Sequence, residues 1–123
     1  MKASLADLLS QISAQHGSPA KQAIAQGFAH GTMSLSLYTP RQGERQEARD
    51  QDAVFIIASG SAEIDLDCAS MSVKMGDAVF ARAGKEHRFS DMSEDFAAWV
   101  MLWGPTGGEA PAISPSVFAA IDA

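Results

Sequence analysis

The feature that most restricts the fold of this chain is a series of short apolar segments separated by turn residues between residues 22 and 103. In residues 33–37, 62–66 and 71–75, apolar and polar side chains alternate. Such alternation puts one kind of side chain on each face of a strand, as a half-buried antiparallel sheet requires. The pattern therefore predicts an all-β barrel or sandwich. The segments that we expect to be strands are 23–28, 32–38, 54–58, 62–66, 70–75, 78–81, 87–89 and 96–103.

A short helix is predicted before the strands. Between residues 4 and 15, leucine and isoleucine side chains recur at the spacing of one helical face. Ser4 and Asp7 resemble a capping box at its start, and Gly17 and Pro19 supply a stop. We expect this helix to pack on the body of the domain.

The last part of the chain reads as a linker followed by a second short helix. Glycine and proline are frequent after residue 104, and Ser114-Pro115 resembles a helix start for residues 117–121. The expected organisation is therefore a helix and linker over residues 1–20, a barrel over 21–109 and a tail over 110–123.

Composition limits the partners and the compartment. The chain has 123 residues, which suits one domain, and a net charge of −6, which argues against nucleic acid. Its only cysteine, Cys68, cannot form an intramolecular disulfide, which suits the cytoplasm. No apolar run approaches the ~18 residues of a membrane span, so we expect no membrane partner.

The segment 76–91 resembles the second cupin motif, which runs Gly, five residues, Pro, one residue, Gly, two residues, His, three residues, Asn. Gly76, Gly84 and His87 fall on its positions, while Arg82 replaces the proline and Asp91 the asparagine. The resemblance implies a jelly-roll cupin barrel, a double-stranded β-helix, with His87 facing its interior. Small cupins commonly form dimers, so it also implies a homodimer.

The first cupin motif is similar in position but has lost its histidines. Gly60 fits its last glycine, which puts the glutamate position at Ala53. The His-x-His pair then falls on Glu47 and Arg49, or on Gln46 and Ala48 in the other spacing. Residues 50–60 and 96–109 also resemble segments of small single-domain cupins.

The resemblance implies a metal site of three histidines and a glutamate, which this chain does not supply. His87 remains and Glu47 is a second candidate, but Ala53 has no ligand atom. Arg49 cannot ligate, and its positive charge would repel a divalent cation. We therefore expect no bound metal and no other cofactor.

Three environments are open for Arg49 if it occupies a ligand position. It could pair with Glu47 or another acid, form an anion-binding pocket with His87, or turn out to solvent. Gln46 belongs to the same candidate pocket. Aromatic side chains could form its apolar walls, although core packing explains them at least as well; they are Phe55, Phe89 and Trp99.

The favoured function is a metal-free, catalytically inactive cupin that binds a small molecule, with a carboxylate favoured. One alternative is a metal-dependent dioxygenase or isomerase type of enzyme that uses His87 and Glu47. The other is a structural homodimer with a filled barrel. Neither Cys68 nor the remaining histidines, His16 and His30, are assigned a role. The two terminal helices are candidates to cover a barrel face or a neighbouring subunit.

Overall fold

The computed structural model describes residues 1–14, 24–40, 45–46 and 49–110, with the main chain alone at residues 14, 45 and 46. The predicted strands and the first helix are all present, with ends that differ by at most two residues. A two-residue strand, β3, was not predicted. The elements are α1 Leu5–Ala14, β1 Ile24–His30, β2 Met33–Tyr38, β3 Arg45–Gln46, β4 Asp52–Ser59, β5 Ser61–Leu66, β6 Ala69–Lys74, β7 Ala78–Ala81, β8 His87–Ser90 and β9 Ala97–Trp103.

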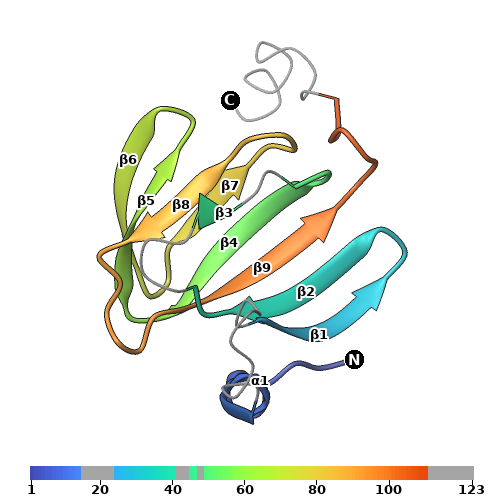
Figure 1. Ribbon diagram of the computed structural model, residues 1–123. Helices are drawn as coiled ribbons and strands as arrows, with labels where there is room; N and C mark the ends of the chain where they lie inside the picture. The colour runs from blue at the N-terminus through green and yellow to red at the C-terminus, as the bar shows by residue number, and fades with distance from the viewer. Residues whose placement is uncertain (15–23, 41–44, 47–48, 111–123) are drawn as a thin grey trace, which may run out of the picture.

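The strands form two antiparallel sheets, as Figure 1 shows. The larger sheet has the order β1-β2-β9-β4-β7 and the smaller one β3-β8-β5-β6. The expected jelly-roll architecture is confirmed. The predicted helix over residues 117–121 lies outside the described residues, and no described helix is long and apolar enough to cross a membrane.

The core lies between the sheets because alternate residues of each strand point inward. Ala53, Phe55 and Ile57 of β4 are buried there, as are Ile64 of β5 and Phe89 of β8. Tyr38, Phe55 and Phe89 are among the largest fully buried side chains. Burying such side chains removes apolar surface from water, which is the main favourable term in folding.

Helix α1 packs on the other face of the larger sheet. The main-chain N–H of Asp7 donates to Ser4 Oγ at 3.4 Å, which is one of the two hydrogen bonds of the predicted capping box. Leu8 and Ile12 are buried against a second cluster that includes Leu37. The larger sheet thus carries apolar side chains on both faces.

Gly60 provides a test of the close contact at the β4–β5 turn. Its φ is +74°, and an added Cβ would lie 2.7 Å from Asp95 Oδ1 and 2.9 Å from Phe96 Cα. Gly31 has a similar φ of +60° but open space around it. Gly31→Ala should cost about 1–2 kcal/mol from φ alone. Gly60→Ala should cost at least about 1 kcal/mol more, measured by urea denaturation. Equal losses would contradict the crowding at Gly60.

Candidate ligand site at His87

His87 begins β8 and points into the barrel. Its main chain pairs with Leu66 of β5 on one side and Gln46 of β3 on the other. The side chain is 3% exposed, and its ring centroid lies 4.7 Å from that of Phe55 and 6.0 Å from that of Phe89. An imidazole thus sits at the end of an aromatic core.

Neither ring nitrogen of His87 has a hydrogen-bond partner within the described part of the chain. Burial, and to a smaller extent the nearby positive charge of Arg49, together lower the pKa of His87 from 6.5 to about 4. The ring is therefore neutral at pH 7, with one nitrogen that donates and one that accepts. Buried polar atoms in folded proteins nearly always have a partner, so these two atoms mark a candidate site.

Arg49 lies just before β4 and supplies a second buried polar group. Its side chain is half-buried, and its Nε has no hydrogen-bond partner among the residues described. The Gly84 N–H donates to the Arg49 carbonyl oxygen at 2.9 Å, which ties Arg49 to the loop that leads to His87. Two segments far apart in sequence are thereby held beside each other.

Asp52 strengthens the same junction. Its carboxylate accepts the N–H of Ala83 at 3.0 Å and that of Glu109 at 2.9 Å. These two main-chain donors hold the pKa of Asp52 below its usual value, and Arg82 acts in the same direction. The buried carboxylate therefore joins the start of β4, the loop before β8 and the segment after β9.

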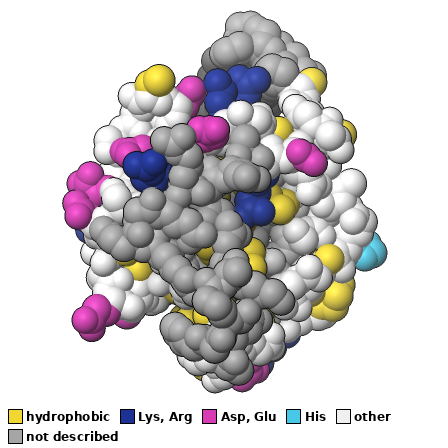
Figure 2. All heavy atoms as spheres, viewed as in Figure 1, with side chains coloured by type: hydrophobic (Ala, Val, Ile, Leu, Met, Phe, Trp, Pro, Cys, Tyr) yellow, Lys and Arg dark blue, Asp and Glu magenta, His cyan; other side chains and the backbone are white. Residues whose placement is uncertain are grey.

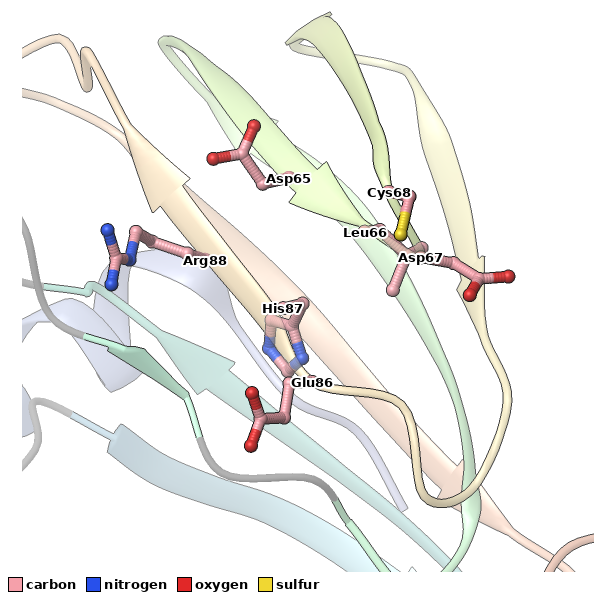
Figure 3. Close-up of a pocket in the computed structure, with 7 residues that line it drawn as sticks. All are labelled: Asp65, Leu66, Asp67, Cys68, Glu86, His87 and Arg88. Atoms are coloured by element: carbon pink, nitrogen blue, oxygen red, sulfur yellow. The ribbon is translucent and has the colours of Figure 1, made fainter.

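A pocket of about 280 Å³ opens next to His87. Figure 3 shows the side chains of His87 and Glu86 pointing to the same side of β8, whereas Asp65 and Arg88 point away from them. Asp67 is paired with Lys85 at 3.3 Å at the exposed rim. The described lining residues are Asp65, Leu66, Asp67, Cys68, Glu86, His87 and Arg88.

Comparison with known proteins identifies the family. No protein-family model matches the chain. It is 32% identical over 85 residues to the uncharacterised protein SCO3923 of Streptomyces coelicolor, covering 68% of this chain and 81% of SCO3923. The chain belongs to the same family as SCO3923.

Solved structures show that the fold is that of a small cupin. A protein of unknown function from Rhizobium leguminosarum has a TM-score of 0.67 at 17% identity, covering 85% of this chain and 97% of that one. A cupin superfamily protein from Desulfitobacterium hafniense has a TM-score of 0.57 at 18% identity, with coverages of 70% and 80%. The DMSP lyase DddQ from Ruegeria pomeroyi has a TM-score of 0.61 at 19% identity, with coverages of 80% and 54%.

The cupin brings together only part of the predicted pocket. His87, Phe55 and Phe89 are in ring contact, and Arg49 is near enough for its charge to act on His87. Gln46 pairs with His87 through the main chain. Glu47 lies outside the described residues.

Trp99 does not form a wall of the interior, contrary to our expectation. It packs against the cluster of α1 that contains Leu8 and Leu37. In β9 it is Ala98 and Val100 that point inward. Residues 96–103 are apolar throughout, so alternation could not show which side chains face the barrel.

The described residues do not fit a cupin metal site. Ala53, at the motif's glutamate position, is buried in the inner core and has no ligand atom. No group of three or more His, Cys, Asp or Glu side chains that could hold a metal occurs in the described ranges. His87 is thus the one motif ligand that the described residues place in the interior.

Sequence reasoning assigned no role to Asp52 or Glu86. Asp52 directly precedes an apolar strand, and an acid at a strand end can bond the main chain of neighbouring loops. Glu86 adjoins the motif histidine, but its direction depends on the loop that ends at His87. Only Asp52 could have been identified from the sequence, by its position directly before an apolar strand.

The neutral state of His87 predicts a pH-dependent stability. The unfolded ring has a pKa near 6.5 and the folded ring one of about 4, so the unfolded state binds more protons between these values. Stability should therefore be full above pH 6.5 and fall by roughly 2–3 kcal/mol as the pH is lowered toward 4. Urea denaturation of the wild type and of His87→Phe across this pH range isolates the contribution of His87 to the free energy of unfolding. His30→Gln, which changes an exposed histidine, is the matched control and should keep the wild-type dependence of stability on pH. If His87→Phe also keeps that dependence, the assignment of the pH effect to His87 is wrong.

Proposed function

We propose that this cupin binds a small anionic organic molecule, such as a carboxylate, at the His87 end of its barrel and does so without a metal. The observation that carries the proposal is the set of buried nitrogen atoms on His87 and Arg49 that have no partner among the described residues. Leaving one such group without a partner costs about 1–3 kcal/mol. A carboxylate would accept hydrogen bonds from both side chains.

The charge of Arg49 favours an anion over a neutral ligand, whereas the pocket beside His87 is also lined by Asp65, Asp67 and Glu86. Arg49 is positively charged, and the burial around it makes an opposite charge more effective than in water. The neutral His87 offers one N–H to a second carboxylate oxygen and one acceptor nitrogen to a hydroxyl or amide. An ion pair between Arg49 and Glu47 would compete with such a ligand. A binding measurement therefore distinguishes an internal ion pair at Arg49 from an anion-binding pocket.

The packing of the interior limits the ligand to a small molecule. Beyond His87 the space between the sheets is filled by Phe55, Phe89 and Tyr38, each fully buried. The pocket of about 280 Å³ beside His87, whose described lining does not include Arg49, lies just below the ~300–1,000 Å³ usual for ligand sites. A ligand would therefore sit at the end of the barrel.

Binding can be tested with malonate and with malonamide, its uncharged counterpart, by thermal shift and titration calorimetry. Malonate should stabilise the folded protein by mass action and so raise its melting temperature. At a hundred times its Kd, the free energy of unfolding should rise by about 2.7 kcal/mol. Malonamide should have little effect. Arg49→Gln should abolish the shift, whereas Arg82→Gln, which removes an exposed arginine, should keep it. If malonate and a wider set of carboxylates cause no shift in the wild type, the proposal is wrong.

Two other functions remain as alternatives. A neutral buried imidazole is the form that binds a metal, and the cupin fold of this chain is shared with a protein named a lyase. An enzyme of this kind would use His87 with Glu47. A structural homodimer would need no ligand, and the dense aromatic interior is compatible with it.

A gain-of-function variant tests the proposal that the protein functions without a metal. The double variant Arg49→His, Ala53→Glu adds two ligand types beside His87 and removes the opposing charge. We expect the wild type to contain well under one equivalent of metal and the double variant to bind Ni or Zn measurably, by elemental analysis and calorimetry. Ala53→Glu alone is the control and should gain much less, because its carboxylate would pair with Arg49.

Equal metal content in the wild type and the double variant would contradict either the absence of a natural metal site or the expected positions of residues 49 and 53. If both were full, the natural site would have ligands beyond those identified. If both were empty, position 49 or position 53 would not face the same space as His87.

A further inference from the structure

The pocket next to His87 is predominantly acidic. Three acids line it, Asp65, Asp67 and Glu86, against a single basic residue, Arg88. Figure 3 shows Asp65 and Arg88 pointing away from the imidazole ring, whereas Glu86 points to the same side of β8 as the ring. Of the three acids, Glu86 is therefore the one that shares its direction with His87.

The charge of Glu86 is not neutralised by any described residue. The ion pair at the rim of the pocket joins Lys85 to Asp67, and Glu86 forms no ion pair within the described ranges. Figure 2 shows several acidic side chains at the left of the view, on the side where β5 and β6 lie in Figure 1. At physiological ionic strength a charge of this kind acts over about 8 Å, so the pocket attracts a cationic group.

Arg49 lies outside this pocket but close to the same imidazole ring. It does not belong to the described lining of the pocket, yet its positive charge acts on His87. The loop that carries Glu86 is also tied to Arg49, because the Gly84 N–H donates to the Arg49 carbonyl oxygen. His87 thus adjoins a basic group and an acidic pocket.

The imidazole of His87 can contact ligand groups of both kinds. Its side chain is 3% exposed and lines the pocket, and neither ring nitrogen has a partner among the residues described. One nitrogen of a neutral imidazole donates, for example to a carboxylate, and the other accepts, for example from an ammonium N–H. A buried group with both capacities unused distinguishes this pocket from a set of surface charges.

A second pocket, of about 520 Å³ on the smaller sheet, shows that acids alone do not make such a site. Its lining includes Glu63, Asp77 and Asp91. Two of these carboxylates already accept hydrogen bonds, Glu63 from the Ser72 hydroxyl at 3.2 Å and Asp77 from the Lys74 N–H at 2.9 Å. Among the described residues that line it, no buried polar side-chain atom lacks a partner. We assign no ligand to this second pocket.

Resting on the proposed function, in which Arg49 and His87 bind a carboxylate, we infer that the ligand is zwitterionic. Its carboxylate lies at Arg49 and the His87 ring, and a cationic group a few bonds away lies in the acidic pocket next to Glu86. A dicarboxylate would place its second negative charge against Glu86, and an uncharged end would leave Glu86 unmatched. The site therefore selects its ligand by repulsion as well as by attraction.

Three short ligands of similar length isolate the charge at the far end of the molecule. They are γ-aminobutyrate, γ-hydroxybutyrate and succinate, whose far ends are positive, neutral and negative. In titration calorimetry with the full chain, the Kd of γ-aminobutyrate should be roughly threefold below that of γ-hydroxybutyrate and roughly tenfold below that of succinate, because an exposed charge pair contributes little. High salt should reduce both differences.

The variant Glu86→Gln keeps the size of the side chain and removes its charge. It should weaken the binding of γ-aminobutyrate and strengthen that of succinate, each roughly threefold. Opposite changes for two ligands cannot come from a general loss of structure. Glu94→Gln, which changes an exposed glutamate outside the pocket, is the matched control and should keep the wild-type order of affinities.

Cys68 supplies a second readout, because the only cysteine of the chain is exposed and lines this pocket. Its thiolate attacks a methanethiosulfonate reagent, so that a disulfide forms and methanesulfinate leaves. The trimethylammonioethyl reagent should be favoured over the sulfonatoethyl reagent more strongly in the folded protein than in the chain unfolded in urea. Glu86→Gln should lower this preference roughly threefold, and Glu94→Gln should not change it. Bound γ-aminobutyrate should slow both reactions.

The outcomes separate this inference from the proposed function. If succinate or γ-hydroxybutyrate binds at least as tightly as γ-aminobutyrate, the ligand is not zwitterionic, while the anion site stands. If Glu86→Gln changes neither the order of affinities nor the reagent preference, the acidic pocket does not hold the cationic group. If none of the three ligands binds and malonate does not bind either, the proposed function itself is wrong.

Discussion

The constraint on which the rest of this structure depends is that the larger sheet is apolar on both faces. The inner face packs against the smaller sheet around Phe55 and Phe89, and this packing closes the barrel. The outer face is covered by α1 over one part, around Leu37 and Trp99. Burial under α1 stabilises this part of the sheet, because each large apolar side chain left in water forgoes about 1.5–3 kcal/mol.

The candidate site follows from how the inner core ends. The aromatic filling stops at His87, and the loop before β8 is tied to Arg49 through Gly84 and to Asp52 through Ala83. That junction holds a positively charged Arg49 near a neutral imidazole. The cost of burying both groups is the physical basis of the proposed anion binding, because an anion would offset it.

The sequence predicted the fold well because strands report their environment locally. Alternation in residues 62–66 and 71–75 showed one polar face, and the smaller sheet indeed has a polar outer surface. Residues 54–58 and 96–103 are apolar at nearly every position, so they carried no alternation from which to choose an inner face. This is why Trp99 was expected in the pocket and lies under α1 instead.

By itself the sequence determined where the strands and turns lie along the chain, because glycine spacing and side-chain periodicity are local properties. The inward direction of His87 was implied by the resemblance to the second cupin motif. The same resemblance put Ala53 at the glutamate position of the first motif, and Arg49 at a histidine position in one of its two spacings. Only the tertiary structure decided which polar groups stay without partners, how Asp52 joins three segments, and which apolar residues form the outer face. These properties depend on contacts between residues far apart in the chain, and no local pattern encodes them.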